Sequence, residues 1–471
     1  MTDIQQQLCN RCKEQPAVAN TRKELFCKEC FSKFILLKQR RTLISDKDKF
    51  LQQIMKVTFK TPNDDKILLA LSMGKSSLIV LQNLIEYLNN QYSQQQQTGF
   101  ILETITVVEN EEEYVKFKTI VNILQTLPEF QVLKKGSIKF RVVNINKLLA
   151  ISENNKLQLL RLSKSDYKLI VQNINDNSND ITLDEILVES FGNQAKTLTS
   201  KEDFKNIAIN NAIEAVYKKY NYVALVYGSS MTKLATEIVT NTVTGRGDVI
   251  ARNLDMKFYP LTDVFYSEVE AYYDLVINNK DILLYNEETG SSSSSSSSTK
   301  KVLLSNELAS ESQPKSRKTK TISDITLDYF NTIEGDYASV ISTVVKTGLK
   351  LKNPNSTDDL NEKFNHCKIC QNRISNKHSP AEWINNITVM KPAIITTDSE
   401  KANFENWEKE VSSIEKTNAK NLGDDELSEV DSGLCYGCIV TLNTSLSKSV
   451  KWTEKTDDDG LLEQVLEEYV L

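Results

Sequence analysis

The sequence predicts an α/β fold, in which helices cover a parallel sheet and a cysteine-rich element flanks the sheet at each end of the chain. Short apolar runs alternate with longer amphipathic runs between residues 60 and 285, which is typical of parallel βαβ units. All eight cysteines lie outside that segment, in four C-x-x-C pairs. Disulfide frameworks rarely have this placement, so the pairs predict metal binding in a reducing compartment.

The bulk composition excludes several classes of protein. The chain of 471 residues is long enough for two or three domains, and its 40% hydrophobic content is ample for a core. Its net charge of −6 excludes an obviously basic nucleic-acid binder, so RNA contacts have to come from local patches or from a partner. The sequence has neither an apolar run of membrane-spanning length nor the apolar core of a signal peptide. We therefore expect a soluble intracellular protein that binds neither membrane nor DNA.

The first predicted domain, residues 1–45, combines two C-x-x-C pairs with a basic helix expected over 31–44. The pairs are separated by 14 residues, which is close to zinc-ribbon spacing, and two such hairpins supply four thiolates to one structural Zn²⁺. Reduced buried thiols and a redox dithiol are the alternatives, although a redox dithiol needs no second pair. The expected ligands are Cys9, Cys12, Cys27 and Cys30.

The second predicted domain, residues 60–285, is the α/β domain. Strands are expected where short apolar runs end at turn residues, and helices where apolar residues recur at helical spacing. The expected strands are 66–72, 100–109, 140–146 and 222–230, with a short extended piece near 258. The expected helices are 76–90, 201–220 with Ser200 as N-cap, 231–243 and one that ends at 277, with a polar loop at 91–99.

The remaining chain divides into an insertion and a last domain. Residues 286–325 include eight consecutive serines, and we expect a disordered insertion because such a segment buries too little apolar surface to offset its ordering entropy. The last domain, 326–471, is expected to begin with a helix over 328–351. Surface insertions are expected at 353–362 and at roughly 398–432, and the second of these is acidic.

Two further C-x-x-C pairs, Cys367/Cys370 and Cys435/Cys438, lie 64 residues apart in the last domain. Because the entropy of closing a loop grows slowly with its length, this separation is compatible with a second structural Zn²⁺ held by four thiolates. No spare cysteine exists, so the pairs either share one site or each remains incomplete. His366 precedes the first pair and is either a further ligand or a surface residue. The chain has only two histidines, which gives His-based catalysis little support.

The loop at 72–77, SMGKSS, follows the first expected strand and precedes a helix. In this layout backbone N–H groups and a helix N-terminus can hold phosphate. A Walker A motif needs a glycine at position 69, where the chain has Leu69. A plain turn without ligand, weak nucleotide or phosphate binding, and active catalysis are the three alternatives.

These features together resemble the cytoplasmic tRNA 2-thiolation protein 2 family, in a fungal form. The resemblance covers most of the chain outside the insertions and implies a cytoplasmic location and an adenine-nucleotide-hydrolase-like domain of the ATP pyrophosphatase (PP-loop) type. Its motifs are the N-terminal C-x-x-C pairs, ALVYGSSMTKLATEIVTNTVTGRGD at 224–248, PLTDVFYSEVEAYY at 260–273, CKIC and CYGC.

The resemblance also gives the loop a reference pattern. The phosphate loop of the ATP pyrophosphatases reads S-G-G-x-D-S, which Ser72, Gly74 and Ser77 match. Met73 replaces the first glycine and adds a side chain where the backbone approaches phosphate. Ser76 replaces the aspartate and removes a fixed anion from a magnesium–pyrophosphate site. We expect the three matching residues to bind nucleotide weakly at most, without efficient ATP turnover.

Two other requirements of the active proteins are missing. Active members of the superfamily have paired acidic residues after a second glycine turn, whereas the matching turn at 228–233 has none before Glu237. They also carry cysteines inside the α/β domain for a cluster or a sulfur relay, whereas no cysteine lies between residues 31 and 366 here. Together with the altered loop, these losses predict a pseudoenzyme subunit without catalytic residues.

The resemblance implies a subunit of a cytosolic complex that thiolates the wobble uridine of tRNAs for lysine, glutamine and glutamate. A catalytic paralogue would form the heterodimer and adenylate the uridine, and a thiocarboxylated ubiquitin-related modifier would supply sulfur. A link to conjugation of that modifier to proteins is also implied. Contact with tRNA is expected around the first cysteine unit, with a merely solvated surface as the alternative. The basic residues concerned are Arg11, Lys13, Arg22, Lys23, Lys28, Lys38, Arg40 and Arg41.

Two other functions stay open at this point. An adenylating tRNA sulfurtransferase that works alone would hydrolyse ATP as a purified chain and lose this activity on mutation of Ser72 or Gly74. A zinc-ribbon interaction module without an RNA role would bind no tRNA, even with its partner present.

Overall fold

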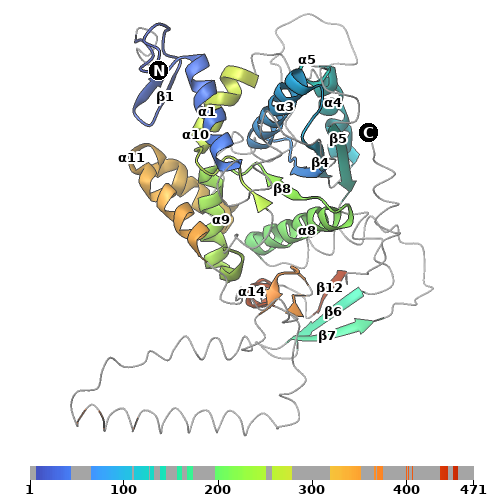
Figure 1. Cartoon of the computed structure of the whole chain (residues 1–471). Coiled ribbons are helices and arrows are strands. Elements are labelled where there is room, and N and C mark those ends of the chain that lie inside the picture. Colours follow the sequence, from blue (N-terminus) through green and yellow to red (C-terminus); the bar gives the residue numbers. More distant parts are fainter. Residues whose placement is uncertain are drawn as a thin grey trace, which may run out of the picture.

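The computed structural model places a five-stranded sheet between helices, with the N-terminal hairpin and helix at the upper left of the view and the C-terminal helix α14 (Tyr436–Asn443) towards the bottom (Figure 1). It describes residues 7–43, 65–108, 111–126, 128–131, 138–144, 156–161, 167–172, 197–250, 257–277, 319–351, 365–367, 369–374, 435–443 and 449–453, and residues 399, 401 and 406. The expected insertions at 353–362 and, apart from those three residues, 398–432 lie outside this part, as does the insertion at 286–325 up to residue 318.

All strand pairs in the central sheet are parallel, in the order β5-β4-β3-β8-β9. The strands are β3 (Lys66–Ala70), β4 (Ile101–Val108), β5 (Ile138–Asn144), β8 (Ala224–Tyr227) and β9 (Lys257–Phe258). The chain order reverses between β3 and β8, where ligands of open parallel sheets bind, at the carboxyl ends of the strands. The loops at 72–77 and 228–232 lie at these two ends. The predicted α/β class with a parallel sheet is therefore confirmed.

Helices cover both faces of the sheet, so the strands are apolar on both faces. In β3, Ile67 and Leu69 belong to one core cluster, which includes side chains of α3 and α4, and Leu68 belongs to another, which includes side chains of α8. The helices concerned are α3 (Lys75–Gln95), α4 (Glu111–Thr126), α5 (Pro128–Gln131) and α8 (Leu198–Lys219). No helix in the described part of the chain is long and apolar enough to cross a membrane.

The second half of the domain continues with α9 and the segment that follows it. The predicted helix at 231–243 is confirmed, and Ser230 caps it by accepting a hydrogen bond from the N–H of Lys233. Beyond it lie η2 (Gly247–Ile250), α10 (Tyr266–Tyr272) and a π-helical turn, η4 (Tyr273–Ile277).

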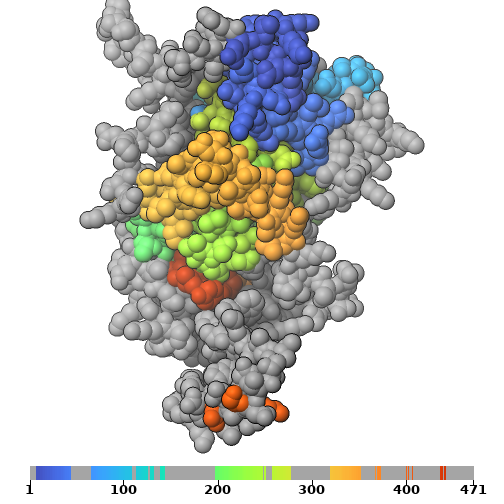
Figure 2. Space-filling model, turned by 90° about the vertical axis from the view of Figure 1, so that its left-hand side faces the viewer, coloured from blue at the N-terminus to red at the C-terminus, as the bar shows by residue number. Residues whose placement is uncertain are grey.

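A long helix, α11 (Ile322–Lys350), packs along α9 and buries Phe330, Ile341 and Val345 against it. Figure 2 shows α11 over α9 on one face of the molecule, between the N-terminal unit and α14. The helix begins before the expected boundary at 325, because Thr321 and Asp324 form a reciprocal capping box.

The N-terminal unit is a hairpin followed by α1. The hairpin pairs β1 (Ala19–Thr21) with β2 (Glu24–Phe26), and α1 spans Lys28–Leu43. The helix buries Phe31, Ile35, Gln39 and Leu43, which are spaced four residues apart and therefore share one face. Gln39 accepts a hydrogen bond from Asn83 of α3.

Two further local predictions differ from the structure. The polar tract at 91–99 was expected to be a loop, yet α3 continues to Gln95 because Gln91 is fully buried and its side chain accepts a hydrogen bond from Gly99 N–H. The N-cap of α8 is Thr197 and not Ser200, since the Thr197 hydroxyl accepts a hydrogen bond from the N–H of Ser200.

The C-terminal elements are small. They are the hairpin β10 (Asn365–His366) with β11 (Arg373–Ile374), and α14 (Tyr436–Asn443). A second, antiparallel sheet has the order β12-β6-β7 and was not expected. It joins β6 (Lys156–Arg161) and β7 (Tyr167–Gln172) to β12 (Ser449–Thr453) from the far end of the chain.

Candidate metal centres and phosphate loop

The N-terminal cysteines converge on one point. Their four sulfur atoms all lie within 4.8 Å of one another, and the Sγ atoms of Cys12 and Cys27 are 3.7 Å apart. Four thiolates at the Zn–S distance in a tetrahedron lie about 3.8 Å apart, so the cluster fits a single tetrahedral ion. Burial opposes ionisation of Cys9, but backbone N–H groups of Cys12, Cys27 and Arg11 lower the pKa of its thiol to about 6.

The C-terminal cysteines form an equivalent cluster, as the sequence predicts. Cys370 and Cys435 place their Sγ atoms 3.5 Å apart, and the N–H of Cys435 donates a hydrogen bond to the sulfur of Cys367 at 3.3 Å. These four cysteines are all buried, whereas two of the N-terminal four are half-exposed. The neighbouring His366 has an exposed side chain and lies outside the four-sulfur group.

The same local structure positions the thiols in both units. The first pair lies in a tight turn, in which the residue after the second cysteine donates its N–H to the carbonyl of the first cysteine. That residue, Lys13 or Gln371, has a left-handed φ of 59° or 58°. The second pair lies at the first turn of a helix, α1 or α14, whose N-terminus favours thiolates. Each unit thus combines a turn with a helix N-terminus around one candidate ion.

The loop at 72–77 is packed against the core and hydrogen-bonded within the chain. Met73, at the position of the first glycine, has a left-handed backbone conformation with φ of 57°, and its side chain is fully buried in the main core. The Met73 side chain therefore packs into the core and anchors the loop there, and it does not lie over the loop on the solvent side. Ser72 and Ser77 place their hydroxyl oxygens 3.2 Å apart, and Ser77 also donates to the carbonyl of Gly74. Lys75 forms an ion pair with Glu270 of α10.

The second loop lies directly on the first, because a Cβ atom at Gly228 would come within 2.6 Å of Ser77 Cα. Its polar side chains bond within the chain. Ser229 donates to Glu237, and Thr232 donates to Glu334 of α11 at 2.8 Å. The contact of Thr232 with Glu334 joins α9 to α11, whereas that of Ser229 with Glu237 ties the loop to α9.

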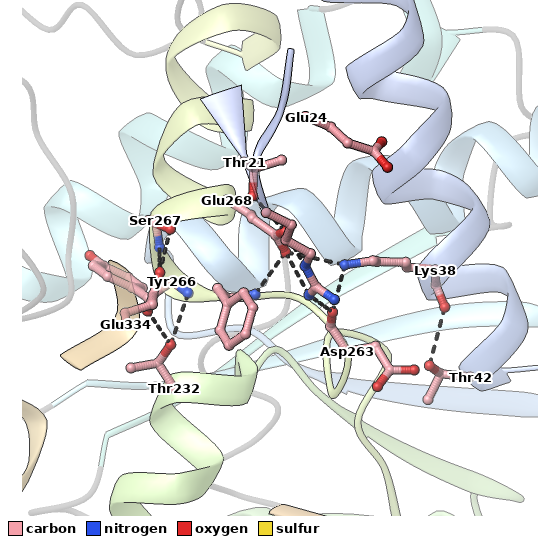
Figure 3. A network of polar contacts seen from close by, with 12 residues as sticks. Thr21, Glu24, Lys38, Thr42, Thr232, Asp263, Tyr266, Ser267, Glu268 and Glu334 are labelled. Carbon is pink, nitrogen blue, oxygen red and sulfur yellow. Dashed lines mark hydrogen bonds and ion pairs between the residues drawn. The ribbon is translucent and has the colours of Figure 1, made fainter. Parts of the chain in front are cut away.

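Two of the basic residues expected at tRNA serve an internal network around Glu268 (Figure 3). The fully buried carboxylate of Glu268 accepts hydrogen bonds from Arg22 Nε at 2.8 Å and Thr21 Oγ1 at 2.8 Å, and pairs with Lys38 Nζ at 3.3 Å. Burial alone would raise its pKa, but Arg22 and Lys38 hold the pKa of Glu268 below the ordinary value. The network fixes the N-terminal unit on α10.

The other six basic residues have exposed side chains on the N-terminal unit. Arg11 stacks over Phe26 with its guanidinium 4.9 Å from the ring centroid, and it forms an exposed ion pair with Glu24. The exposed residues are Arg11, Lys13, Lys23, Lys28, Arg40 and Arg41.

Sequence reasoning missed the residues that hold the units together, above all Glu268, Glu334 and Arg246. Glu268 and Arg246 lie within the motifs PLTDVFYSEVEAYY and TGRGD, so their segments were noticed but their roles were not. The only sign of these roles in the sequence was a charged residue within an otherwise apolar motif or turn motif. Such a sign does not show which residue the charged side chain contacts in the folded chain.

The fold and the sites define a class of protein in which a parallel α/β domain is preceded and followed in the chain by a four-cysteine unit. The chain belongs to the cytoplasmic tRNA 2-thiolation protein 2 family, as its sequence motifs indicated. The model of that family matches residues 321–440. The chain is 33% identical to the Kluyveromyces lactis member over 98% of both chains, and 32% identical to the Scheffersomyces stipitis member over 98% of this chain and 95% of the relative.

A solved structure is also similar to this chain. It is the U34-tRNA thiolase NcsA from Methanococcus maripaludis with its [4Fe-4S] cluster, at 15% identity and a TM-score of 0.44. The similarity covers 84% of this chain and 100% of that chain.

We predict that Glu268→Gln lowers the free energy of unfolding by about 3 kcal/mol, because it leaves the half-buried Lys38 and the more exposed Arg22 without the buried carboxylate that they share. Urea denaturation followed by circular dichroism measures this. The matched control is Glu270→Gln on the same helix, whose side chain is 43% exposed and whose loss should cost less than about 1 kcal/mol. Equal effects of the two variants would contradict the role assigned to Glu268.

Proposed function

We propose that this chain is a non-catalytic subunit of a cytoplasmic complex that thiolates tRNA. The observation that carries the proposal is the state of the two loops at the switch point of the sheet. Ser76 replaces the loop aspartate, Met73 is part of the core, and Thr232 and Ser229 of the second loop bond to acids within the chain. Groups that an adenylating enzyme needs for pyrophosphate and magnesium are used here for packing.

The finer features of this function rest on the family resemblance. The complex would modify the wobble uridine of the tRNAs for lysine, glutamine and glutamate. The catalytic partner would be a paralogous thiolase subunit in a heterodimer, and sulfur would come from a thiocarboxylated ubiquitin-related modifier, with a further link to conjugation of that modifier. The names of the curated relatives, which are cytoplasmic tRNA 2-thiolation proteins, support the substrate and the location.

The two four-cysteine clusters would each hold a structural Zn²⁺. Tetrahedral sites made only of thiolates suit zinc, and the sulfur separations of 3.5 and 3.7 Å match one ion in each. Bound zinc would join the turn and the helix N-terminus of each unit into one structure, because the two- and three-residue strands of these units, and the eight-residue α14, bury little apolar surface by themselves.

We expect two zinc ions per purified chain by inductively coupled plasma mass spectrometry. Ser substitution of Cys12 should remove one of them and leave the other, and Ser substitution of Cys370 should do the same for the second site. Iron in either site, or absorption of a cluster near 400 nm, would contradict the zinc assignment.

The exposed basic residues of the N-terminal unit would contact the tRNA backbone together with the partner. Charge reversal of Lys23, Arg40 and Arg41 should weaken tRNA binding by the heterodimer at least tenfold and reduce its salt dependence, since fewer phosphate contacts release fewer counterions. Filter binding at several salt concentrations measures both. The control reverses the charge of the exposed Lys201 and Lys346, away from this unit, and should leave the affinity unchanged. Equal losses in both variants would contradict a local tRNA site.

The subunit role is tested by assaying tRNA thiolation with each subunit alone and with both combined. This chain alone should be inert and should raise the activity of its partner. Ser72→Ala should leave the combined activity unchanged, because the loop performs no chemistry. ATP consumption and tRNA thiolation by this chain alone, abolished in Ser72→Ala, would instead establish an independent sulfurtransferase. Absence of tRNA binding by the complex would favour the interaction module.

A further inference from the structure

A buried arginine lies against the C-terminal cysteine cluster. Arg246 follows α9 and is only 4% exposed. Its Nη1 atom is 3.5 Å from the sulfur of Cys438 and 4.0 Å from that of Cys435. The other side of the same guanidinium forms two hydrogen bonds to Asp203 of α8, from Nε at 3.0 Å and from Nη2 at 2.6 Å. One planar group therefore bridges the α/β domain and the candidate metal centre.

We infer that Arg246 is a positioning residue of the C-terminal metal centre, which it couples to the α/β domain and shields from exchange. The inference rests on the proposed zinc site. Four thiolates and one divalent cation carry a net negative charge, and a guanidinium remains charged at every relevant pH. N–H donation to the sulfur atoms reduces their nucleophilicity, so alkylating agents react with them less readily. The bonds from the same guanidinium to Asp203 hold the cluster against the α/β domain, which slows release of the metal to a chelator. Groups that orient metal ligands in this way typically contribute 10- to 100-fold in metal affinity.

Two glycines leave the space that the side chains of Arg246 and Tyr436 occupy. A Cβ atom on Gly437, the glycine of the CYGC motif, would lie 2.4 Å from Arg246 Cγ. On the other side, Gly245 has φ of 76°, and a Cβ atom there would lie 2.7 Å from the ring of Tyr436. The TGRGD and CYGC motifs thus interlock through their glycines, each of which leaves room for a side chain of the other motif.

A third contact ties the ligand helix to the same point. Thr441, one turn after Cys438 in α14, accepts a hydrogen bond from Arg246 Nη2 at 3.2 Å and donates one to Asp203 at 2.5 Å. The side chains of Asp203, Arg246 and Thr441 therefore form a closed network. Loosening the arginine would free the helix that supplies two of the four thiolates.

The rival interpretation is an ordinary buried ion pair between Arg246 and Asp203 that lies near the cysteines by coincidence. It predicts that loss of either partner lowers the free energy of unfolding but leaves the exchange of metal unaffected in the folded protein. The N-terminal cluster supplies an internal reference, because its half-exposed thiols make it the faster site to react in the same chain.

The experiment measures release of zinc to a colorimetric chelator from the full-length chain, with mass spectrometry of alkylated cysteines to assign each kinetic phase. Wild type should release one ion quickly from the N-terminal unit and one slowly from the C-terminal unit. Arg246→Gln should accelerate the slow phase at least tenfold and leave the fast phase unchanged. Arg246→Lys, which keeps the charge but loses the planar fork, should be intermediate.

Two further variants complete the test. Gly437→Ala should reproduce the effect of Arg246→Gln by displacing the guanidinium, whereas Gly247→Ala, whose added Cβ meets nothing within 4 Å, should behave as wild type. A slow phase at the wild-type rate in Arg246→Gln, or equal acceleration of both phases, would overturn the inference. If Arg246→Gln is insoluble, a wild-type slow phase in both Arg246→Lys and Gly437→Ala overturns it. Wild type with fewer than two zinc ions would instead refute the proposed site itself.

Discussion

The buried charge of Glu268 is the constraint on which the attachment of the N-terminal unit depends. A carboxylate without solvent contact is tolerable only when cations and hydrogen-bond donors surround it, and Arg22, Lys38 and Thr21 of the N-terminal unit supply them. If the unit left α10, this carboxylate would lose both cations and the Thr21 hydroxyl, and of these hydrogen bonds it would keep the one from the N–H of Phe265. Arg246 is the counterpart with the opposite sign, since Asp203 and the sulfur of Cys438 surround it. Each cysteine unit is thus attached to the α/β domain by a buried charged side chain, Glu268 or Arg246, whose charge is balanced by partners in the assembled structure.

Internal contacts also account for the arrangement of the two loops at the switch point of the sheet. In a parallel sheet this position collects loop backbone and helix N-termini, so a chain that performs no chemistry there can use the groups for cohesion. Met73 extends the core into the loop, Gly228 brings the second loop onto Ser77, and Glu334 joins α9 to α11 through Thr232. The groups of both loops are thus engaged in contacts within the chain, which agrees with the proposed supporting role.

Features encoded by neighbouring residues could be predicted from the sequence. The helix at 231–243 was located correctly because a glycine turn and the capping Ser230 precede it, and the cysteine pairs were found because C-x-x-C is a local signature. Thr197 and Ser200 are both suitable caps, and only the folded chain decides between them. The strand β12 pairs with β6 from the far end of the chain, and Arg22 lies 246 residues from Glu268. Partners at such separation leave no periodicity or spacing in the sequence.

The two cysteine units share one local design but differ in their surroundings, and this difference suggests why the chain keeps both. The N-terminal unit places half-exposed thiols beside a surface of exposed lysines and arginines, so its metal would stabilise a platform that faces a charged partner. The C-terminal unit is buried on all four sulfurs and contacts α8 and the turn after α9, so its metal would stabilise a junction inside the molecule. A short hairpin and an eight-residue helix bury too little apolar surface to remain docked by themselves. In the proposed zinc-bound state, the metal and the buried Arg246 would together stabilise this small unit against the α/β domain.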